Sequence, residues 1–192
     1  MVAARRSIDE RIGDRWVCAG HSEGSMATLF TSVRDDHPVP LLGAAAFAPV
    51  TRMDLTIGAS ARLPVVPPSF GVVSALVGLM LLGAGTVSDD VSAGIEGDGL
   101  HEPARGLWPH LPERSLTELS RADSWGAVPG RRIATPRLYR DLFEVMRAND
   151  VADLTPRVPV RIDWGRYDEV APWFLTRRLL AGYTRRGVDL VE

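Results

Sequence analysis

Residues 16–25 read WVCAGHSEGS, and this stretch decides how the rest of the chain is interpreted. Residues 15–20 form a short, mainly apolar run that predicts a buried strand, and the turn Gly20-His21-Ser22-Glu23-Gly24 follows at once. From Ser25 onward, apolar side chains recur every three or four positions, a spacing typical of a helix that ends near residues 35–38; they are Met26, Leu29, Phe30 and Val33. A Gly-x-Ser-x-Gly turn therefore lies between a predicted strand and a predicted helix.

This turn is a candidate nucleophile turn because its flanking elements are the ones such a turn requires. A tight strand-to-helix turn holds its serine in a strained backbone conformation and raises the hydroxyl above the sheet. We expect side chains at Gly20 or Gly24 to collide with the neighbouring helix and strand, which would explain both glycines. The backbone N–H of Glu23 would bind the oxyanion of a tetrahedral intermediate. Ser22 is thus the candidate nucleophile; the competing interpretation is a glycine-rich loop with an incidental serine.

The apolar runs predict an α/β fold with a parallel sheet. Residues 41–50 form a second continuous apolar run, and two such runs separated by a helix suit parallel strands covered on both faces. The sheet is predicted to resume at residues 159–165, which read PVRIDWG. A helix over about 173–186 follows, closed by Gly187, and residues 188–192 alternate like the start of another strand.

Residues 51–150 have a different character from the flanking segments. Proline, glycine and short helical patterns predominate there, without convincing strands. The apolar run Val72 to Leu82 would face a core or an apolar pocket. We therefore predict a sheet core made of residues 1–50 and 151–192, with a helical cap or lid inserted over residues 51–150. A further short helix is expected at residues 3–12.

Composition restricts the classes of partner and cofactor. The 192 residues carry a formal net charge of −2, and the 22 basic residues, all arginine, are scattered, which argues against a nucleic-acid partner. A single cysteine, Cys18, excludes an internal disulfide and a cysteine-rich zinc site, and its apolar surroundings predict a small buried thiol. No metal-binding pattern or cofactor motif is present. The N-terminus has no signal-peptide core, and the longest apolar stretch, residues 70–85, is short for a transmembrane segment.

Residues 17–25 and 46–51 resemble the secretory lipases of bacteria and fungi, which belong to the α/β-hydrolase superfamily. In that family a similar Ala-Pro stretch follows the nucleophile helix and leads into a large helical cap. Residues 159–172 resemble the superfamily segment of strand, glycine, loop, aspartate and proline. The resemblance makes Asp168 the triad acid that orients the catalytic histidine. A turn aspartate is the alternative for Asp168, and Asp163, expected to pair with an arginine, is its competitor.

The resemblance implies a serine carboxylic-ester hydrolase, a lipase or esterase of lipid catabolism that needs no cofactor. Its substrates would be lipid or other small apolar esters, and the family is secreted. Two residues depart from the family pattern: Glu23 stands where a glutamine is frequent, and Ser25 where a glycine is frequent. An acid beside the nucleophile raises the cost of forming an oxyanion, so we expect reduced activity.

The catalytic histidine is the component that the sequence does not supply. In the family the order is Ser, Asp, His, whereas His21, His37, His101 and His110 all precede Asp168. We expect two of three triad residues and half of the oxyanion hole, hence a truncated chain that is weak or inactive as written. His101 and His110 fall in the predicted cap and stay open as substitutes. The alternative function is a non-catalytic hydrolase fragment that binds an apolar ligand or self-associates through an exposed sheet edge. An acyltransferase or peptidase with the same turn also stays open.

Overall fold

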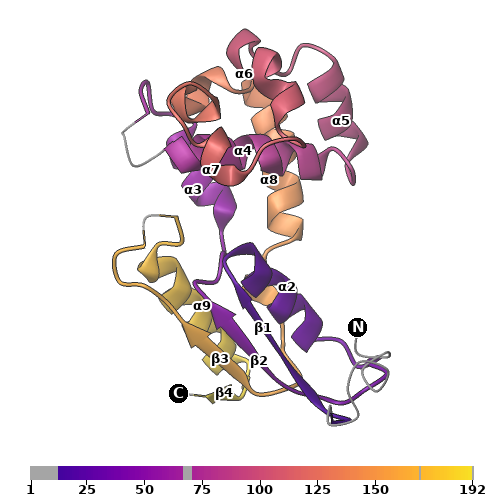
Figure 1. Ribbon diagram of the computed structural model, residues 1–192. Helices are drawn as coiled ribbons and strands as arrows, with labels where there is room; N and C mark the ends of the chain where they lie inside the picture. The colour runs from indigo at the N-terminus through magenta and orange to yellow at the C-terminus, as the bar shows by residue number, and fades with distance from the viewer. Residues whose placement is uncertain (1–12, 67–70, 169, 192) are drawn as a thin grey trace. The chain divides into compact units, whose positions relative to one another are not determined.

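The computed structural model describes residues 13–66, 71–168 and 170–191 (Figure 1). The chain divides into two compact units. The sheet unit comprises Met1–Thr51 and Asp150–Glu192, and the helical unit comprises Arg52–Asn149. The helix predicted for residues 3–12 lies outside the described residues.

The sheet unit contains four parallel strands in sequence order, so the fold is α/β as predicted. They are β1 (Trp16–His21), β2 (Leu41–Phe47), β3 (Val160–Asp163) and β4 (Leu190–Val191). The register places Gly20, Ala46 and Ile162 in one row and His21, Phe47 and Asp163 in the next. All four strands therefore end at one edge of the sheet, which is called the carboxyl edge below.

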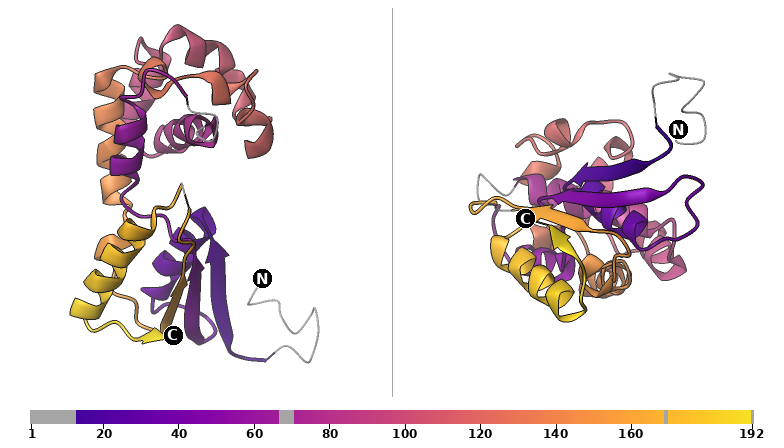
Figure 2. Two further views of the ribbon diagram at one scale, coloured as in Figure 1. Left: turned by 90° about the vertical axis from the view of Figure 1, so that its left-hand side faces the viewer. Right: turned by 90° about the horizontal axis from the view of Figure 1, so that it is seen from below.

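Helix α2 (Glu23–Ser32) joins β1 to β2, and α9 (Trp173–Arg185) joins β3 to β4. Both helices pack on the same face of the sheet, and Figure 2 shows α9 along it. Their apolar side chains meet the inward side chains of the strands in one core, and the members from the helices are Leu29, Leu179 and Tyr183. A short 3-10 turn (Val151–Asp153) completes this layer, where the Tyr183 hydroxyl donates to the carbonyl of Val151 at 3.0 Å.

The opposite face of the sheet is open in the described part of the chain, so the prediction of cover on both faces was wrong. On that face the exposed fraction is 68% for Val17, 49% for Val191 and 40% for Phe47. The reason is topological. Crossovers between parallel strands are right-handed, and strands added in one direction, in the order β1-β2-β3-β4, place both crossover helices on one face.

A local signal sets the C-terminal end of α9, as the sequence indicated. Gly187 has a φ of 72°, the left-handed conformation that glycine adopts without steric cost. The N–H groups of Gly187 and Val188 donate to the carbonyls of Thr184 and Tyr183, both at 3.1 Å. These bonds satisfy the last turn of the helix and direct the chain into β4.

In the helical unit, the other elements pack around one apolar helix, α4 (Gly71–Ala84). These elements are α3 (Met53–Ser60), α5 (Asp89–Glu96), α6 (Glu102–Leu107), α7 (Leu116–Leu119) and α8 (Pro136–Ala148), with 3-10 turns at Trp108–His110, Trp125–Ala127 and Gly130–Arg132. Val77 and Leu81 of α4 are fully buried, and a Cβ on Gly78 would lie 2.9 Å from the Trp125 ring. The only strand pairing among the described residues of this unit is a single antiparallel bridge between Leu100 and Ala134.

By length and composition, no single described helix could cross a membrane, although α4 and α5 together would pass that test as a pair bent by 118°.

Candidate active site

Ser22 lies between the last residue of β1 and the first residue of α2, with φ 55° and ψ −118°. A side chain in this region of backbone space costs on the order of 1–3 kcal/mol, so the surroundings must hold it there. The Ser22 N–H donates to the Phe47 carbonyl at 2.9 Å, and the Ser22 carbonyl accepts from the N–H at 2.9 Å and the hydroxyl of Ser25. The Ser22 hydroxyl makes no capping bond to α2. The backbone is thus fixed, and the hydroxyl is not used to cap the helix.

The two glycines of the turn play different roles. A Cβ on Gly20 would lie 1.9 Å from the Gly24 carbonyl oxygen and 2.7 Å from the Thr28 hydroxyl oxygen, so only glycine fits. A Cβ on Gly24 would meet no heavy atom within 4 Å, which makes the expected collision there wrong. Gly24 is exposed in the first turn of α2, so a side chain there would extend into open space.

Glu23 is the first residue of α2, so its backbone N–H has no acceptor within the helix. This N–H adjoins the Ser22 hydroxyl at the positive end of the helix dipole. An N–H in this place can donate to an oxygen that becomes negative during attack by Ser22. The Glu23 side chain itself is exposed.

Asp168 follows β3 and lies at the carboxyl edge, as Ser22 does after β1. One strand, β2, separates β1 from β3, so two strand spacings of about 4.8 Å each separate these two strands. The Asp168 Oδ1 accepts from the N–H groups of Val170 at 2.9 Å and Ala171 at 2.8 Å. These bonds are those of a turn aspartate, and they also fix the carboxylate. Its other oxygen has no hydrogen-bond partner in the part of the chain that the structure describes.

The Asp163 carboxylate is paired with an arginine, as the sequence indicated. The Arg161 Nε and Nη2 donate to its two carboxylate oxygens at 2.7 and 3.0 Å. The hydrogen bonds from Arg161 hold the pKa of Asp163 below its usual range. Asp163 is therefore engaged with its neighbour, and Asp168 is the aspartate with an open oxygen.

The two histidines of the sheet unit are not placed to serve Ser22. His37 packs edge-on against Trp16, with ring centroids 5.4 Å apart, and its Nε2 lies 3.1 Å from the Thr31 carbonyl. Trp16 begins β1 whereas Ser22 follows its end, about 20 Å away at the rise of an extended strand. His37 is thus half-buried and lies at the opposite edge of the sheet. His21 is exposed on the open face, in a row with Phe47.

The other two histidines belong to the helical unit. His101 precedes α6 as its N-cap residue. His110 ends a 3-10 turn, with its Nε2 3.5 Å from the Arg114 Nη2. The Nδ1 of His110 is buried without a partner among the described residues.

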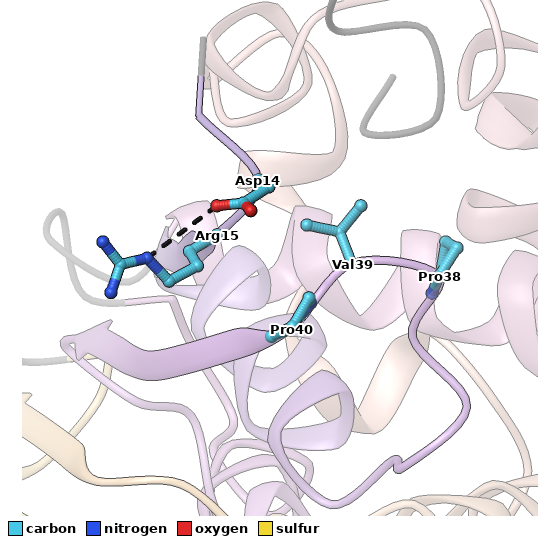
Figure 3. Close-up of a pocket in the computed structure, with 5 residues that line it drawn as sticks. All are labelled: Asp14, Arg15, Pro38, Val39 and Pro40. Carbon is cyan, nitrogen blue, oxygen red and sulfur yellow. Dashed lines mark ion pairs between the residues drawn. The ribbon is translucent and has the colours of Figure 1, made fainter.

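A surface depression of about 620 Å³ lies at the amino ends of β1 and β2, on the opposite edge from Ser22 (Figure 3). Its lining residues are Asp14, Arg15, Pro38, Val39 and Pro40. Asp14 and Arg15 form a loose ion pair at 3.9 Å, and both side chains are largely exposed. The depression includes neither Ser22 nor Asp168 and offers no reactive group.

The described residues near Ser22 provide neither a metal-binding group nor a reactive thiol. In residues 13–66, 71–168 and 170–191, no group of three or more His, Cys, Asp or Glu side chains could hold a metal ion. Cys18 is half-buried rather than fully buried, with its Sγ 3.8 Å from the carbonyls of Thr28 and Gly43. Burial raises the pKa of its thiol, which disfavours the nucleophilic thiolate.

Two features of the carboxyl edge were not foreseen. Ala48, after β2, has a φ of 48°, and its N–H donates to the Asp163 carbonyl at 2.8 Å. The loop and helix around Asp168 carry exposed aromatic side chains, among them Tyr167 and Phe174. The sequence signal for the second feature was present, since residues 164–174 contain four aromatic residues.

No protein-family model and no curated protein matches the chain. Solved structures do. The ligand-bound rice cell wall degrading esterase LipA from Xanthomonas oryzae matches with a TM-score of 0.74 and 15% identity, over 99% of this chain and 53% of that one. Candida antarctica lipase A in its closed state matches with a TM-score of 0.75 and 15% identity, over 99% of this chain and 45% of that one. The chain thus spans about half the length of these proteins and shares their α/β-hydrolase fold.

Proposed function

We propose that the chain is a serine hydrolase of carboxylic esters, of the lipase or esterase type, acting on lipid or other apolar esters. The observation that carries this proposal is the strained Ser22 at the strand-to-helix turn, with its hydroxyl outside the helix cap. Strain of this kind persists only where the surroundings hold it, and it is concentrated at functional sites. That an esterase and a lipase share the fold supports the same reaction class.

In the proposed reaction, the Ser22 Oγ attacks the ester carbonyl carbon while a base takes its proton. The carbonyl oxygen becomes an oxyanion that accepts from the Glu23 N–H. Collapse expels the alcohol, which takes up that proton, and leaves an acyl group on Ser22; water then releases the acid by the same steps. The open oxygen of Asp168 would orient the base and stabilise its charged form.

Neither His21 nor His37 is placed to act as this base. Within the chain, His101 and His110 are the candidates for substitution. A serine without a base is a weak nucleophile, so we expect slow turnover if neither serves. In triad enzymes the loss of one member leaves a residual rate of about 10³–10⁴ over water.

The test is fluorophosphonate labelling of the full chain, together with turnover of p-nitrophenyl butyrate. Labelling and turnover should vanish in Ser22→Ala and persist in Ser92→Ala, a control on a partly exposed side chain of α5. Asp168→Asn should lower turnover, whereas Asp163→Asn, which removes only the partner of Arg161, should not. Turnover unchanged in Ser22→Ala would refute the proposal.

The same measurements on His101→Ala and His110→Ala identify the base. Turnover that vanishes in Ser22→Ala and in one of these variants alone assigns the base to that histidine. Equal, slow turnover in both variants means that the chain works without either histidine.

A second candidate function, association without catalysis, is favoured by the open sheet face and by the edge position of β1. It would use the apolar side chains that this face exposes, including Val17 and Phe47. It predicts a concentration-dependent oligomer with no labelling of Ser22.

A further inference from the structure

Four aromatic side chains are exposed in one short segment at the carboxyl edge of the sheet. The exposed fraction is 42% for Trp164, 91% for Tyr167, 41% for Trp173 and 57% for Phe174. Among the described residues, Phe47 is the only other aromatic residue in this exposed class. Clustered exposure of large apolar side chains marks interaction sites, whereas single ones are common on any surface.

Hydrogen bonds and ring contacts order part of this segment. Asp168 Oδ1 accepts hydrogen bonds from the backbone N–H groups of residues 170 and 171, which forms a local turn shortly before α9. At the start of α9, the rings of Trp173 and Phe174 meet edge to face, with centroids 6.2 Å apart and planes at 85°. The Arg177 guanidinium lies 5.7 Å from the centre of the Trp173 ring.

Positive charge lies beside the aromatic side chains. Residues 164–186 contain five arginines against two acidic residues, in a chain whose formal net charge is −2. Arg177, Arg178 and Arg185 are exposed on α9, and the helix contains no acidic residue. Arg177 and Arg178 stand one turn after Trp173 and Phe174, so charge and aromatic rings share the exposed face of the helix.

We infer that this aromatic–arginine surface, made of Trp164, Tyr167, Trp173, Phe174, Arg177 and Arg178, binds an anionic lipid surface. Tryptophan and tyrosine side chains are stable at the level of lipid headgroups, where the ring is buried and its polar edge stays wet. Arginines that flank such rings are attracted to anionic headgroups. Single-stranded nucleic acid also binds aromatic rings and arginines, but this surface contains four large aromatic side chains and only two arginines, a balance that favours lipid.

The surface occupies the same sheet edge as Ser22 and Asp168. A lipid surface bound there would bring its molecules to the edge where the proposed ester chemistry takes place. Binding itself uses neither the Ser22 hydroxyl nor a base. The inference therefore goes beyond the proposed function and survives or fails separately from it.

The experiment measures co-sedimentation of the full chain with vesicles, and the accompanying change in tryptophan fluorescence. Vesicles of phosphatidylcholine mixed with phosphatidylglycerol should bind the chain more tightly than phosphatidylcholine alone, and added salt should weaken the difference. The double variant Trp173→Ala, Phe174→Ala should bind roughly tenfold more weakly or worse, as expected for lost burial of large apolar side chains. Arg177→Ala with Arg178→Ala should weaken binding about fivefold per arginine, on the anionic vesicles only.

Matched substitutions separate this surface from general stickiness. Val65→Ala with Val87→Ala removes similarly exposed apolar side chains from the helical unit, and Arg131→Ala with Arg132→Ala removes exposed arginines there. Both controls should bind vesicles like the parent chain. Ser22→Ala should also bind like the parent, so vesicle binding and ester hydrolysis can fail independently.

Three results would overturn the inference. One is the absence of vesicle binding by the parent chain, and another is equal loss of binding in the controls and the aromatic variant. The third is tighter binding to an oligothymidine strand than to anionic vesicles, which would assign the surface to nucleic acid. The aromatic positions are exposed, and a thermal unfolding curve like that of the parent would show that the variants are folded.

Discussion

Among single residues, the two glycines of the turn around Ser22 are expected to respond differently to substitution by alanine. Gly20→Ala should lower the free energy of unfolding by about 3 kcal/mol or more, because its Cβ would lie 1.9 Å from a backbone oxygen that cannot rotate away. Gly24→Ala is the matched control, with open space around the new Cβ and an expected change of no more than about 1 kcal/mol. Urea unfolding measures both. Equal effects would mean that the close contact at Gly20 is absent.

Because the Ser22 backbone is strained, replacing Ser22 with glycine should stabilise the fold while removing the reactive hydroxyl. Ser22→Gly should raise the free energy of unfolding by about 1 kcal/mol, because glycine adopts a φ of 55° without steric cost and only part of that gain is lost to backbone entropy. Ser22→Ala keeps the strain and should show no comparable gain. Both variants lose fluorophosphonate labelling. A stabilised Ser22→Ala, or a destabilised Ser22→Gly, would contradict the strained turn.

The conformation of a residue could be predicted from the sequence where it depends on neighbours close in the chain. The Ser22 turn needs only a strand, glycines and a helix in succession, and Gly187 needs only the end of α9. The contact of His37 with Trp16 joins residues that are far apart in the chain, so no local pattern showed it. The expected collision at Gly24 was wrong because the space around a Cβ depends on the packing of the folded turn, which the local pattern does not show.

At the scale of elements, Asp54 links α3 to α8 in the helical unit. Arg52 Nε donates to its Oδ1 at 3.0 Å and Arg147 Nη1 lies 3.8 Å from its Oδ2. Burial acts to raise the pKa of Asp54, but the hydrogen bonds and charge of Arg52, helped by Arg147, outweigh it and hold this pKa below its usual range.

A lowered pKa in the folded state contributes stability above the unfolded pKa and loses it as the pH falls through the folded value. Asp54→Asn should therefore cost about 1 kcal/mol at neutral pH, and the difference from the parent should shrink below about pH 4. Urea unfolding at pH 7 and in acid measures it. Asp36→Asn is the control, because its pair with Arg34 is exposed and should add little. A difference that grows in acid would contradict the assigned sign.

Strand β1 is an edge strand in the described sheet, and edges of this kind recruit other strands. We predict self-association that a charge on β1 suppresses. Val17, 68% exposed, should give a more monomeric protein when changed to lysine, as measured by sedimentation velocity over a concentration series. Val87→Lys is the control, since Val87 is 73% exposed in the helical unit. If the parent chain is monomeric, or if both variants change the sedimentation coefficient equally, self-association through β1 is excluded.

Element types were predictable from apolar periodicity, because strands and helices bury side chains at different spacings. Apolar periodicity did not predict which faces of the sheet are packed against helices. Uninterrupted apolar runs such as residues 41–50 suggested burial on both faces, yet this run is rich in alanine, which tolerates partial exposure on the open face. Which face a helix covers follows from strand order and crossover handedness, and strand order is a property of the whole sheet.

At the scale of the whole molecule, the helical unit is one continuous segment, Arg52–Asn149, inserted between two segments of the sheet unit. The sheet-unit residues on either side of the insertion are joined, since the Thr51 hydroxyl donates to the Asp150 Oδ1 at 2.7 Å. Insertions succeed where the two ends of the inserted segment lie close together, because the host then needs no rearrangement. The sequence indicated this plan through the lack of convincing strands between residues 51 and 150, the proline, glycine and short helical patterns there, and the resemblance to a family with a helical cap.

We predict that residues 52–149, expressed alone, fold cooperatively. The segment is about 100 residues long, a common size for an independent domain. Its core is its own, with Ile57, Val77, Leu81, Trp125 and Leu138 almost fully buried. A stability of about 5–10 kcal/mol is expected for that length. Circular dichroism should show a helical protein with a single thermal transition, and urea unfolding should give the same midpoint by tryptophan fluorescence.

Trp125→Ala provides the internal control for this prediction. The Trp125 ring packs against α4, and its Nε1–H donates to the Leu107 carbonyl at 3.2 Å. Its loss should cost about 3–5 kcal/mol in the isolated segment, as for other large aromatic residues removed from cores. If this variant unfolds while the parent segment does not, the core of the helical unit is self-sufficient. An isolated segment that binds hydrophobic dyes and melts without a transition would instead show that residues 52–149 need the sheet unit to fold.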